Sequence, residues 1–267
     1  MAEALLLQLG VAGPFNGSAL HAGLLGLLGA SSLLLGAAVG YWLRLPHSAV
    51  AGAMAFAAGV LLALVSFDLI ERSYEAAGLL PTSIGFIGGV ALFTGCNQLL
   101  IRSGGQHRKR SGCNPCERQT SSAGLAIALG TLLDGVPESF VVGVSTLGGG
   151  HQSALAVAAF FLANFPEALS STAGMKQAGR TSAFIFGLWG GIVAASAAAA
   201  AVGHYVLAGD PGSGAALALG VAGGAIVAMV VDTMLPEATD DAHRFTGIVA
   251  AAGFLAAFIL SRTLTGE

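Results

Sequence analysis

Long apolar runs recur along the whole chain, and they constrain its fold more than any other feature of the sequence. Each run is about 20 residues long, which is enough for an α-helix to cross roughly 30 Å of hydrocarbon. The runs lie near residues 18–42, 49–70, 82–101, 122–147, 152–175, 182–207, 215–238 and 246–261. We therefore predict an all-α polytopic membrane protein with eight transmembrane helices.

The composition fits this class. Hydrophobic residues fill 55% of the 267 positions and charged residues only 9%, whereas about a quarter of the residues in a soluble domain are charged. The 40 glycines predict a compact bundle, because small side chains let helices approach closely in lipid. We expect one transmembrane domain over residues 1–267 with an inner loop at 103–121. We expect no signal peptide, since no basic stretch precedes the first apolar patch.

Positive charges separate between the two sides of this topology. If the N-terminus lies outside, the outer side holds only Arg72 and Arg262. The inner connections hold the other basic residues, which are Arg44, Arg102, Arg108, Lys109, Arg110, Arg118, Lys176, Arg180 and Arg244. Because Lys and Arg favour cytoplasmic loops, we expect a plasma (inner) membrane protein with both termini on the outer or periplasmic side.

Acidic side chains interrupt the central apolar runs. Asp134 and Glu138 are four residues apart near the middle of the fourth run. Asn164 and Glu167 are three residues apart in the fifth run. Each pair therefore shares one face of its helix.

A proline precedes the glutamate in three runs. The triplets are Val136-Pro137-Glu138, Phe165-Pro166-Glu167 and Leu235-Pro236-Glu237, and the third follows Asp232 toward the inner end of the seventh run. Proline cannot donate a hydrogen bond to the carbonyl four residues earlier. At membrane depth such a freed oxygen is tolerated where it lines a cavity or is buried in protein. A freed carbonyl beside a carboxylate therefore indicates an oxygen cage for a cation.

The cost of burying these acids limits what they can do. Apart from Asp68 near the end of the second span, five acids lie within the predicted spans. Each charged side chain near a span centre costs about 2.5–3.5 kcal/mol. No Lys, Arg or His lies at the same depth in the predicted helices. We expect the acids to be protonated, hydrated in a channel, or neutralised by bound metal. The alternative is a structural role, in which basic residues of neighbouring helices neutralise them.

The segments DGVPESFVVGVS, ANFPEALSS and DTMLPEA resemble the ZIP family of divalent metal transporters. The resemblance implies eight spans in a 3+2+3 arrangement, with a metal site between the fourth and fifth spans. It implies that Asp134, Glu138, Asn164 and Glu167 are the metal ligands. It also implies that spans one, four, five and six move against spans two, three, seven and eight in a homodimer.

Two departures from the family pattern bear on the metal. Asp134 stands where the family usually has histidine, and Asn164 stands where many members have His or Asp. The sixth span carries no carboxylate for a second metal, so we expect a single site. Oxygen donors suit Mn²⁺, Mg²⁺ or Ca²⁺ better than Zn²⁺, with Fe²⁺ intermediate. The expected substrate is a divalent cation of the Mn, Fe or Zn class.

Further acids mark the predicted ends of the metal path. Asp68 lies near the outer end of the second span, and Asp232 and Glu237 lie where the ion would leave. Asp68 has two interpretations, which both stay open. It can form an ordinary helix pair with Arg72, four residues on, or an outer metal vestibule with Glu71.

The remaining cysteines and histidines carry weaker signals. Cys113 and Cys116 form a C-x-x-C pair near His107 in the inner loop, which suits a metal-relaying or regulatory loop as well as a plain flexible one. His21, His47 and His204 lie at span ends, where we expect interfacial side chains. His151 lies in a short outer turn, where we expect a solvated side chain, although it could touch an entering metal. His243 lies close to Asp232 and Glu237, where the ion would leave.

Two other classes of function compete with metal transport. In a proton-coupled carrier or antiporter of another substrate, the same acids would carry protons. In an intramembrane enzyme they would form an active site, but the sequence contains no H-E-x-x-H and no G-x-S-x-G motif. We therefore expect no enzyme. The expected partners are the metal ion, membrane lipid and a second copy of the chain, with no nucleic acid.

Overall fold

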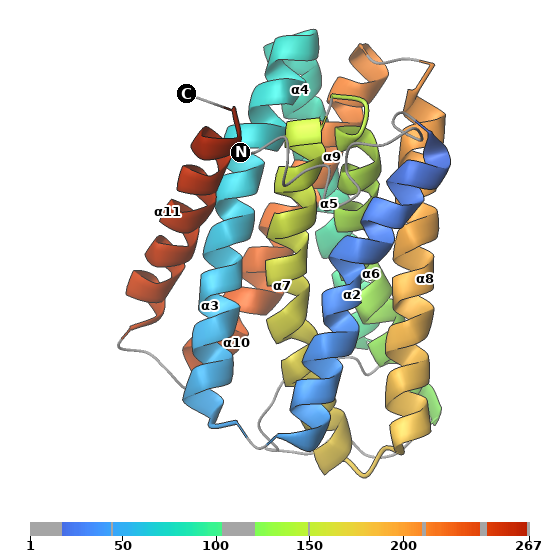
Figure 1. The fold of residues 1–267 in the computed structure, drawn as a ribbon, viewed down its shortest axis with the longest axis vertical. Helices are drawn as coiled ribbons and strands as arrows, with labels where there is room; N and C mark the ends of the chain where they lie inside the picture. Colours follow the sequence, from blue (N-terminus) through green and yellow to red (C-terminus); the bar gives the residue numbers. More distant parts are fainter. Residues whose placement is uncertain are drawn as a thin grey trace.

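The fold is that of a computed structural model, which describes residues 18–43, 45–102, 121–148, 150–209, 212–240 and 245–265. In these ranges all regular elements are helices, and they join into eight long helices (Figure 1). Six of them are single α-helices: α2 (Ala19–Trp42), α5 (Leu79–Arg102), α6 (Ser121–Ser145), α7 (Gly150–Gln177), α8 (Ser182–Leu207) and α11 (Thr246–Thr265). The second long helix consists of α3 (His47–Leu64), the π-helical turn η1 (Val65–Leu69) and α4 (Ile70–Ala77). The seventh consists of α9 (Ser213–Met229), the π-helical turn η2 (Val230–Met234) and α10 (Leu235–Asp240).

The helix lengths agree with a multi-pass membrane protein. Seven of the eight helices are long and apolar enough to cross a membrane within the described residues. The eighth, α6, has 25 residues and is therefore about 37 Å long. The predicted all-α class and the eight helices are confirmed, and seven candidate spans support the membrane assignment. The inner loop predicted at 103–121 lies outside the described residues, except that Ser121 already begins α6.

The second helix is longer than predicted. The sequence indicated a span ending near residue 70 and a polar turn after it, but the helix continues through the segment IERSYEAA to Ala77. Gly78 ends the helix with a φ of +79°, and its N–H donates to the carbonyl of Tyr74 at 2.7 Å. Glycine adopts this left-handed conformation without a steric penalty, which makes it a common helix terminator. The polar segment therefore extends the helix beyond its apolar part.

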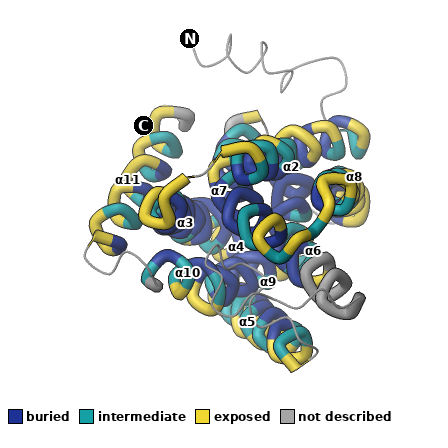
Figure 2. Tube along the Cα trace, turned by 90° about the horizontal axis from the view of Figure 1, so that it is seen from below, coloured by how far each residue is buried: buried dark blue, intermediate teal, exposed yellow. Residues whose placement is uncertain are grey.

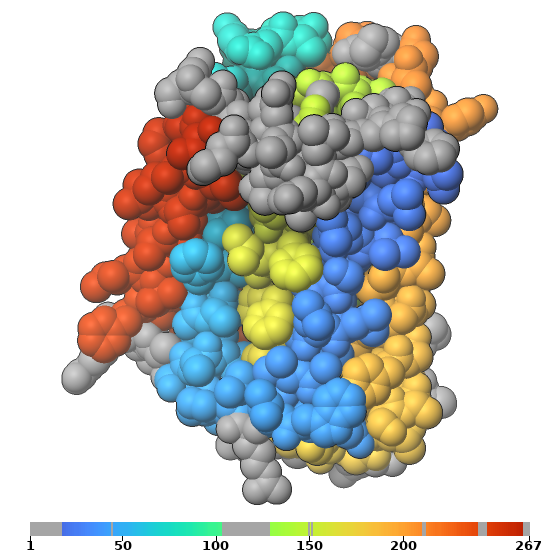
Figure 3. Space-filling view, viewed as in Figure 1, coloured from blue at the N-terminus to red at the C-terminus, as the bar shows by residue number. Residues whose placement is uncertain are grey.

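The eight helices pack as two groups of four. The α2 group consists of α2, α6, α7 and α8, and the α3 group consists of α3–α4, α5, α9–α10 and α11. Within the bundle α7, α3 and α9 are largely buried, whereas α5 and α11 lie at the periphery (Figure 2). In the space-filling view, side chains of α7 reach the surface in the gap between α2 and α3 (Figure 3). This gap is the seam between the two groups.

Glycines bring the helices of each group into close contact. A Cβ added to any of four glycines would lie about 2 Å from a backbone oxygen of the paired helix. These glycines and the oxygens are Gly36 and Phe165 O (2.2 Å), Gly59 and Ala250 O (1.9 Å), Gly89 and Val221 O (2.0 Å), and Gly143 and Ala200 O (2.0 Å). The close helix packing predicted from the glycine content is thereby confirmed, because no larger residue fits at these positions.

The glycine contacts also reveal an internal repeat. They pair α2 with α7 and α6 with α8 in one group, and α3 with α11 and α5 with α9 in the other. In this repeat α2 is equivalent to α8, α3–α4 to α9–α10, and α5 to α11. The two central helices, α6 and α7, are equivalent to each other. The second and seventh helices each contain a five-residue π-helical turn with an aspartate, Asp68 in η1 and Asp232 in η2. Single π-helical turns are frequent at functional sites.

Candidate functional site

Four polar side chains lie deep in the α2 group. Asp134 and Glu138 on α6, and Asn164 and Glu167 on α7, are each at most 6% exposed. Both helices run without a break through the proline that precedes the glutamate. The spacing predicted that each pair shares one face of its helix, and the structure buries all four side chains.

The α2 helix fixes the turn of α7 that carries Asn164 and Glu167. Asn164 Nδ2 donates to the carbonyl oxygen of Gly29 at 3.5 Å. Gly36 lies against the carbonyl oxygen of Phe165, and Gly40 lies against that of Leu169. The face of α2 that carries these glycines thus lies along the segment of α7 that contains Pro166 and Glu167. The position of Glu167 depends on this contact, because any side chain on that face would push α7 away.

The partner of α6 is α8. Gly143 packs against the backbone of Ala200 and His204, and Gly203 packs against Phe140. This contact holds the upper half of α6, which follows Glu138. Asp134 and Glu138 are therefore carried by a helix that is tied to α8, while Asn164 and Glu167 are carried by a helix that is tied to α2.

The two buried pairs do not form one ligand cluster in this conformation. Among the described side chains, no group of three or more His, Cys, Asp or Glu residues is placed to hold a metal ion. The helices α6 and α7 contact each other far less than they contact α8 and α2. The structure therefore buries both pairs but does not gather three charged or imidazole ligands around one point.

At the upper end of Figure 1, Asp68 pairs with Arg72. Arg72 Nη1 lies 3.2 Å from Asp68 Oδ2, so the helix pair predicted from the spacing is confirmed. Arg72 Nη1 also lies 3.3 Å from Ser145 Oγ, the last residue of α6. Asp68 is buried and Glu71 is exposed. The vestibule of Asp68 with Glu71 stays a prediction.

At the lower end, the two predicted acids differ in their surroundings. Glu237 on α10 is half-buried, and its Oε1 accepts a hydrogen bond from Ser170 Oγ on α7 at 2.5 Å. Asp232 in η2 is exposed. The structure thus brings Glu237 to the helix that carries Glu167, but it does not bury Asp232 with the other acids.

Two histidines near helix ends, His21 on α2 and His204 on α8, are buried. His21 and His204 are 7% and 5% exposed, so both pack inside the protein. Their predicted place at the membrane interface stays a prediction. His204 Nδ1 lies 2.7 Å from Thr146 Oγ1, just above α6. Gly203 and the backbone of His204 both lie in the contact of α8 with α6, and a glycine is the signal that the sequence offers for such a contact. His47 is exposed, as predicted.

Other predicted residues lie outside the described part of the structure. Cys113, Cys116 and His107 fall in 103–120, and His243 falls in 241–244. The side chain of His151 is also outside it.

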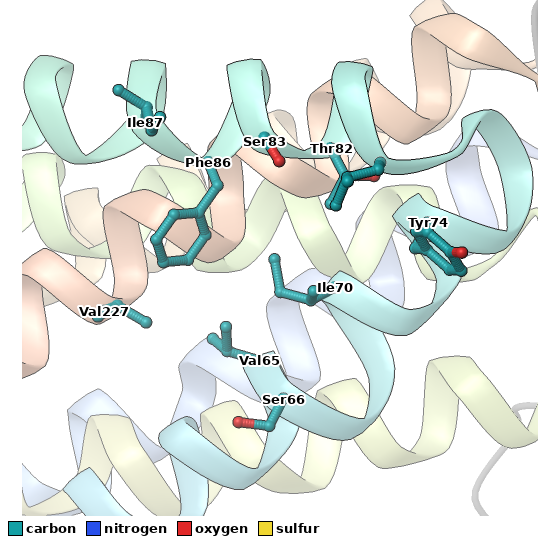
Figure 4. A pocket seen from close by; sticks show the side chains of 10 residues that line it. Val65, Ser66, Ile70, Tyr74, Thr82, Ser83, Phe86, Ile87 and Val227 are labelled. Atoms are coloured by element: carbon teal, nitrogen blue, oxygen red, sulfur yellow. The ribbon is translucent and has the colours of Figure 1, made fainter.

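A cavity of about 640 Å³ lies between α4 and α5, beside η1 (Figure 4). Its lining is apolar, with Val65, Ile70 and Phe86 around its centre. Ser66 Oγ on its wall donates to the carbonyl of Leu62, and Thr82 Oγ1 donates to the carbonyl of Gly78, between α4 and α5. None of the four deeply buried polar residues of α6 and α7 lines it, so this cavity is separate from the candidate site.

No model of a known protein family matches the chain, and no curated protein matches its sequence significantly.

Proposed function

We propose that this protein carries divalent metal cations across the membrane, through a site lined by Asp134, Glu138, Asn164 and Glu167. The observation that carries the proposal is the burial of three carboxylates and one amide on α6 and α7. Three charged side chains near the middle of a membrane cost about 8–10 kcal/mol together. A divalent cation offsets this cost by neutralising two of the charges at once.

The arrangement of the helices supports the ZIP-like reading of the sequence. That resemblance implies a transport unit of spans one, four, five and six and a scaffold of spans two, three, seven and eight. The α2 group and the α3 group contain these same spans. We propose that the two groups move relative to each other in alternating access, within a homodimer.

The distribution of described basic residues supports the proposed orientation. Arg102 lies in the last turn of α5, Lys176 lies in the last turn of α7, and Arg180 follows α7. The α7 helix ends at the lower end of Figure 1. Arg72 lies on α4 and Arg262 lies in the last turn of α11, and both of these segments are at the upper end. Because basic residues favour the cytoplasmic side, the upper end faces outside in this proposal.

Loading of the ion involves more than the four side chains. Pro137 and Pro166 have no N–H to donate to the carbonyl oxygens of Leu133 and Leu162. In this proposal each of these two freed oxygens is an additional ligand for the ion. The described conformation does not gather three acidic side chains. Binding therefore requires α6 and α7 to move so that their two ligand pairs come closer together. This movement links binding to a change of conformation.

Uptake into proteoliposomes tests the proposal. A metal-sensitive fluorophore inside the vesicles reports ion entrance, and a pH-sensitive fluorophore reports protons. Metal-dependent uptake that follows the metal gradient supports the proposal. Proton flux without any metal flux would instead favour the second candidate, a proton-coupled carrier, which the same buried carboxylates also allow.

The donor set predicts which metals compete best. Carboxylate and amide oxygens favour hard cations, so Mn²⁺ and Fe²⁺ should inhibit uptake of labelled Mn²⁺ more strongly than Zn²⁺ at equal concentration. The measurement is a competition series with Mn²⁺, Fe²⁺, Zn²⁺, Mg²⁺, Ca²⁺ and Cd²⁺ on the purified protein. A wide preference for Zn²⁺ over Mn²⁺ would show that nitrogen or sulfur ligands outside the four residues take part.

A further inference from the structure

Arg72 is a charged side chain that links the two helix groups. It lies on α4, one turn after the π-helical turn η1, and its side chain is 17% exposed. Its Nη1 contacts Asp68 on its own helix at 3.2 Å and Ser145 on α6 at 3.3 Å. Its Nη2 lies 2.9 Å from the place that a Cβ on Gly148 would take, in the turn after α6. One guanidinium thus touches the α3 group and the upper end of the α2 group.

The contact lies on the face of α6 that carries the buried acids. Asp134, Glu138, Val141 and Ser145 follow one another at spacings of four, three and four residues, so they share one helix face. Ser145 is seven residues beyond Glu138, which is about 10 Å along the helix. A cation that approaches Glu138 along this face from the upper end first meets the positive charge of Arg72. Like charges at such distances repel each other.

A second contact joins the groups at the opposite end. Ser170, which lies three residues beyond Glu167 on α7, donates a hydrogen bond to Glu237 on α10. The internal repeat makes α4 equivalent to α10, and α6 equivalent to α7. The contacts Arg72 to Ser145 and Ser170 to Glu237 therefore join equivalent pairs of helices, one toward each end of the site. Ser145 lies seven residues beyond Glu138, and Ser170 lies three residues beyond Glu167.

We infer that Arg72 is an outer latch, which holds the upper ends of α4 and α6 together and closes the approach to the buried acids. Opening requires the guanidinium to leave Ser145, and Asp68 then becomes available to an incoming cation. Ser170 with Glu237 forms the corresponding inner latch. Arg72 is a positioning residue, because it acts on the state of the two groups and contacts none of the four proposed ligands. The transport consequence rests on the proposed function, whereas the closure itself does not.

Cysteine accessibility tests the outer latch without any metal. Val141, which is fully buried between Glu138 and Ser145, is replaced by cysteine in a chain whose Cys96, Cys113 and Cys116 are replaced by alanine. A charged, membrane-impermeant methanethiosulfonate reagent is added from the side of the upper end. Arg72→Gln should raise the modification rate of this cysteine about tenfold or more, since a hydrogen bond to a charged group is lost.

Matched variants make the outcome specific. Arg262→Gln removes an exposed arginine of α11 and should leave the rate unchanged. Ser145→Ala removes the contact but keeps the charge, so it should also raise the rate, whereas Ser139→Ala on the same helix should not. An unchanged rate in both Arg72→Gln and Ser145→Ala, or an equal rise in Arg262→Gln, would overturn the latch.

The same experiment separates the latch from the transport proposal. If Arg72→Gln raises the modification rate but the native protein transports no metal, the latch is supported and the proposed function is contradicted. Metal uptake with unchanged accessibility in both latch variants would keep the function and remove the latch.

Discussion

Glu138→Gln and Glu167→Gln should each abolish metal uptake and leave the protein folded. Each change removes one negative charge from the buried site but keeps the size of the side chain. The expected loss of initial uptake rate is about 100-fold or more, since even residues that only support a metal ligand typically cost 10–100-fold. Folding should be retained or improved, because a neutral amide is cheaper to bury in a membrane than a carboxylate.

The measurement is the initial uptake rate of Mn²⁺ into proteoliposomes, at equal amounts of protein and at several metal concentrations. Glu75→Gln is the control, because Glu75 is an exposed acid on α4 and its loss should not change the rate. Uptake at the normal rate in either buried-acid variant would contradict the assignment of that residue as a ligand. A similar loss in Glu75→Gln would point to a general effect of surface charge.

Gly36→Ala should destabilise the protein strongly, whereas Gly88→Ala should not. The new Cβ at position 36 would lie 2.2 Å from the carbonyl oxygen of Phe165 and 3.1 Å from the amide nitrogen of Leu169. The helices α2 and α7 must separate to admit it, and overpacking of this kind costs about 1–3 kcal/mol. Since Phe165 directly precedes Pro166 and Glu167, metal uptake should fall in the protein that remains folded.

The check is the thermal unfolding midpoint of both variants in one detergent, together with uptake. Gly88 is an exposed helical position on α5 with no atom within 4 Å of its Cβ site. Alanine there should be neutral or slightly stabilising, because it forms helix more readily than glycine. Equal midpoints for the two variants would mean that α2 and α7 are not held at the distance described.

The sequence was sufficient to predict the helices and the deepest acids. Apolar length decides whether a segment spans a membrane, so eight runs led to eight long helices. The four-residue and three-residue spacings of Asp134 with Glu138 and of Asn164 with Glu167 predicted one shared face for each pair, and the structure buries all four side chains. These signals are local, and the structure retains them.

The contacts between helices could not be predicted in the same way. Hydropathy describes a segment, whereas the pairing of α2 with α7 depends on which glycine faces which carbonyl. The spacing of Ser145 and Ser170 gives their helix face but not their partners, so their links to Arg72 and Glu237 appeared only in the structure. Asp232 also precedes a proline-glutamate pair, but it lies five residues before Glu237, whereas Asp134 lies four residues before Glu138. The structure leaves Asp232 exposed, although Asp68 in the corresponding turn η1 is buried.

Direct binding of Mn²⁺ to the purified protein tests the central claim, namely that the buried carboxylates of α6 and α7 hold a divalent ion. Free Mn²⁺ is followed by electron paramagnetic resonance during a titration in lipid nanodiscs. The account predicts one bound ion per chain, with binding lost in Glu138→Gln and in Glu167→Gln and kept in Glu75→Gln. Binding that is equally strong in all three variants, or no binding of any divalent ion to the native protein, would contradict it.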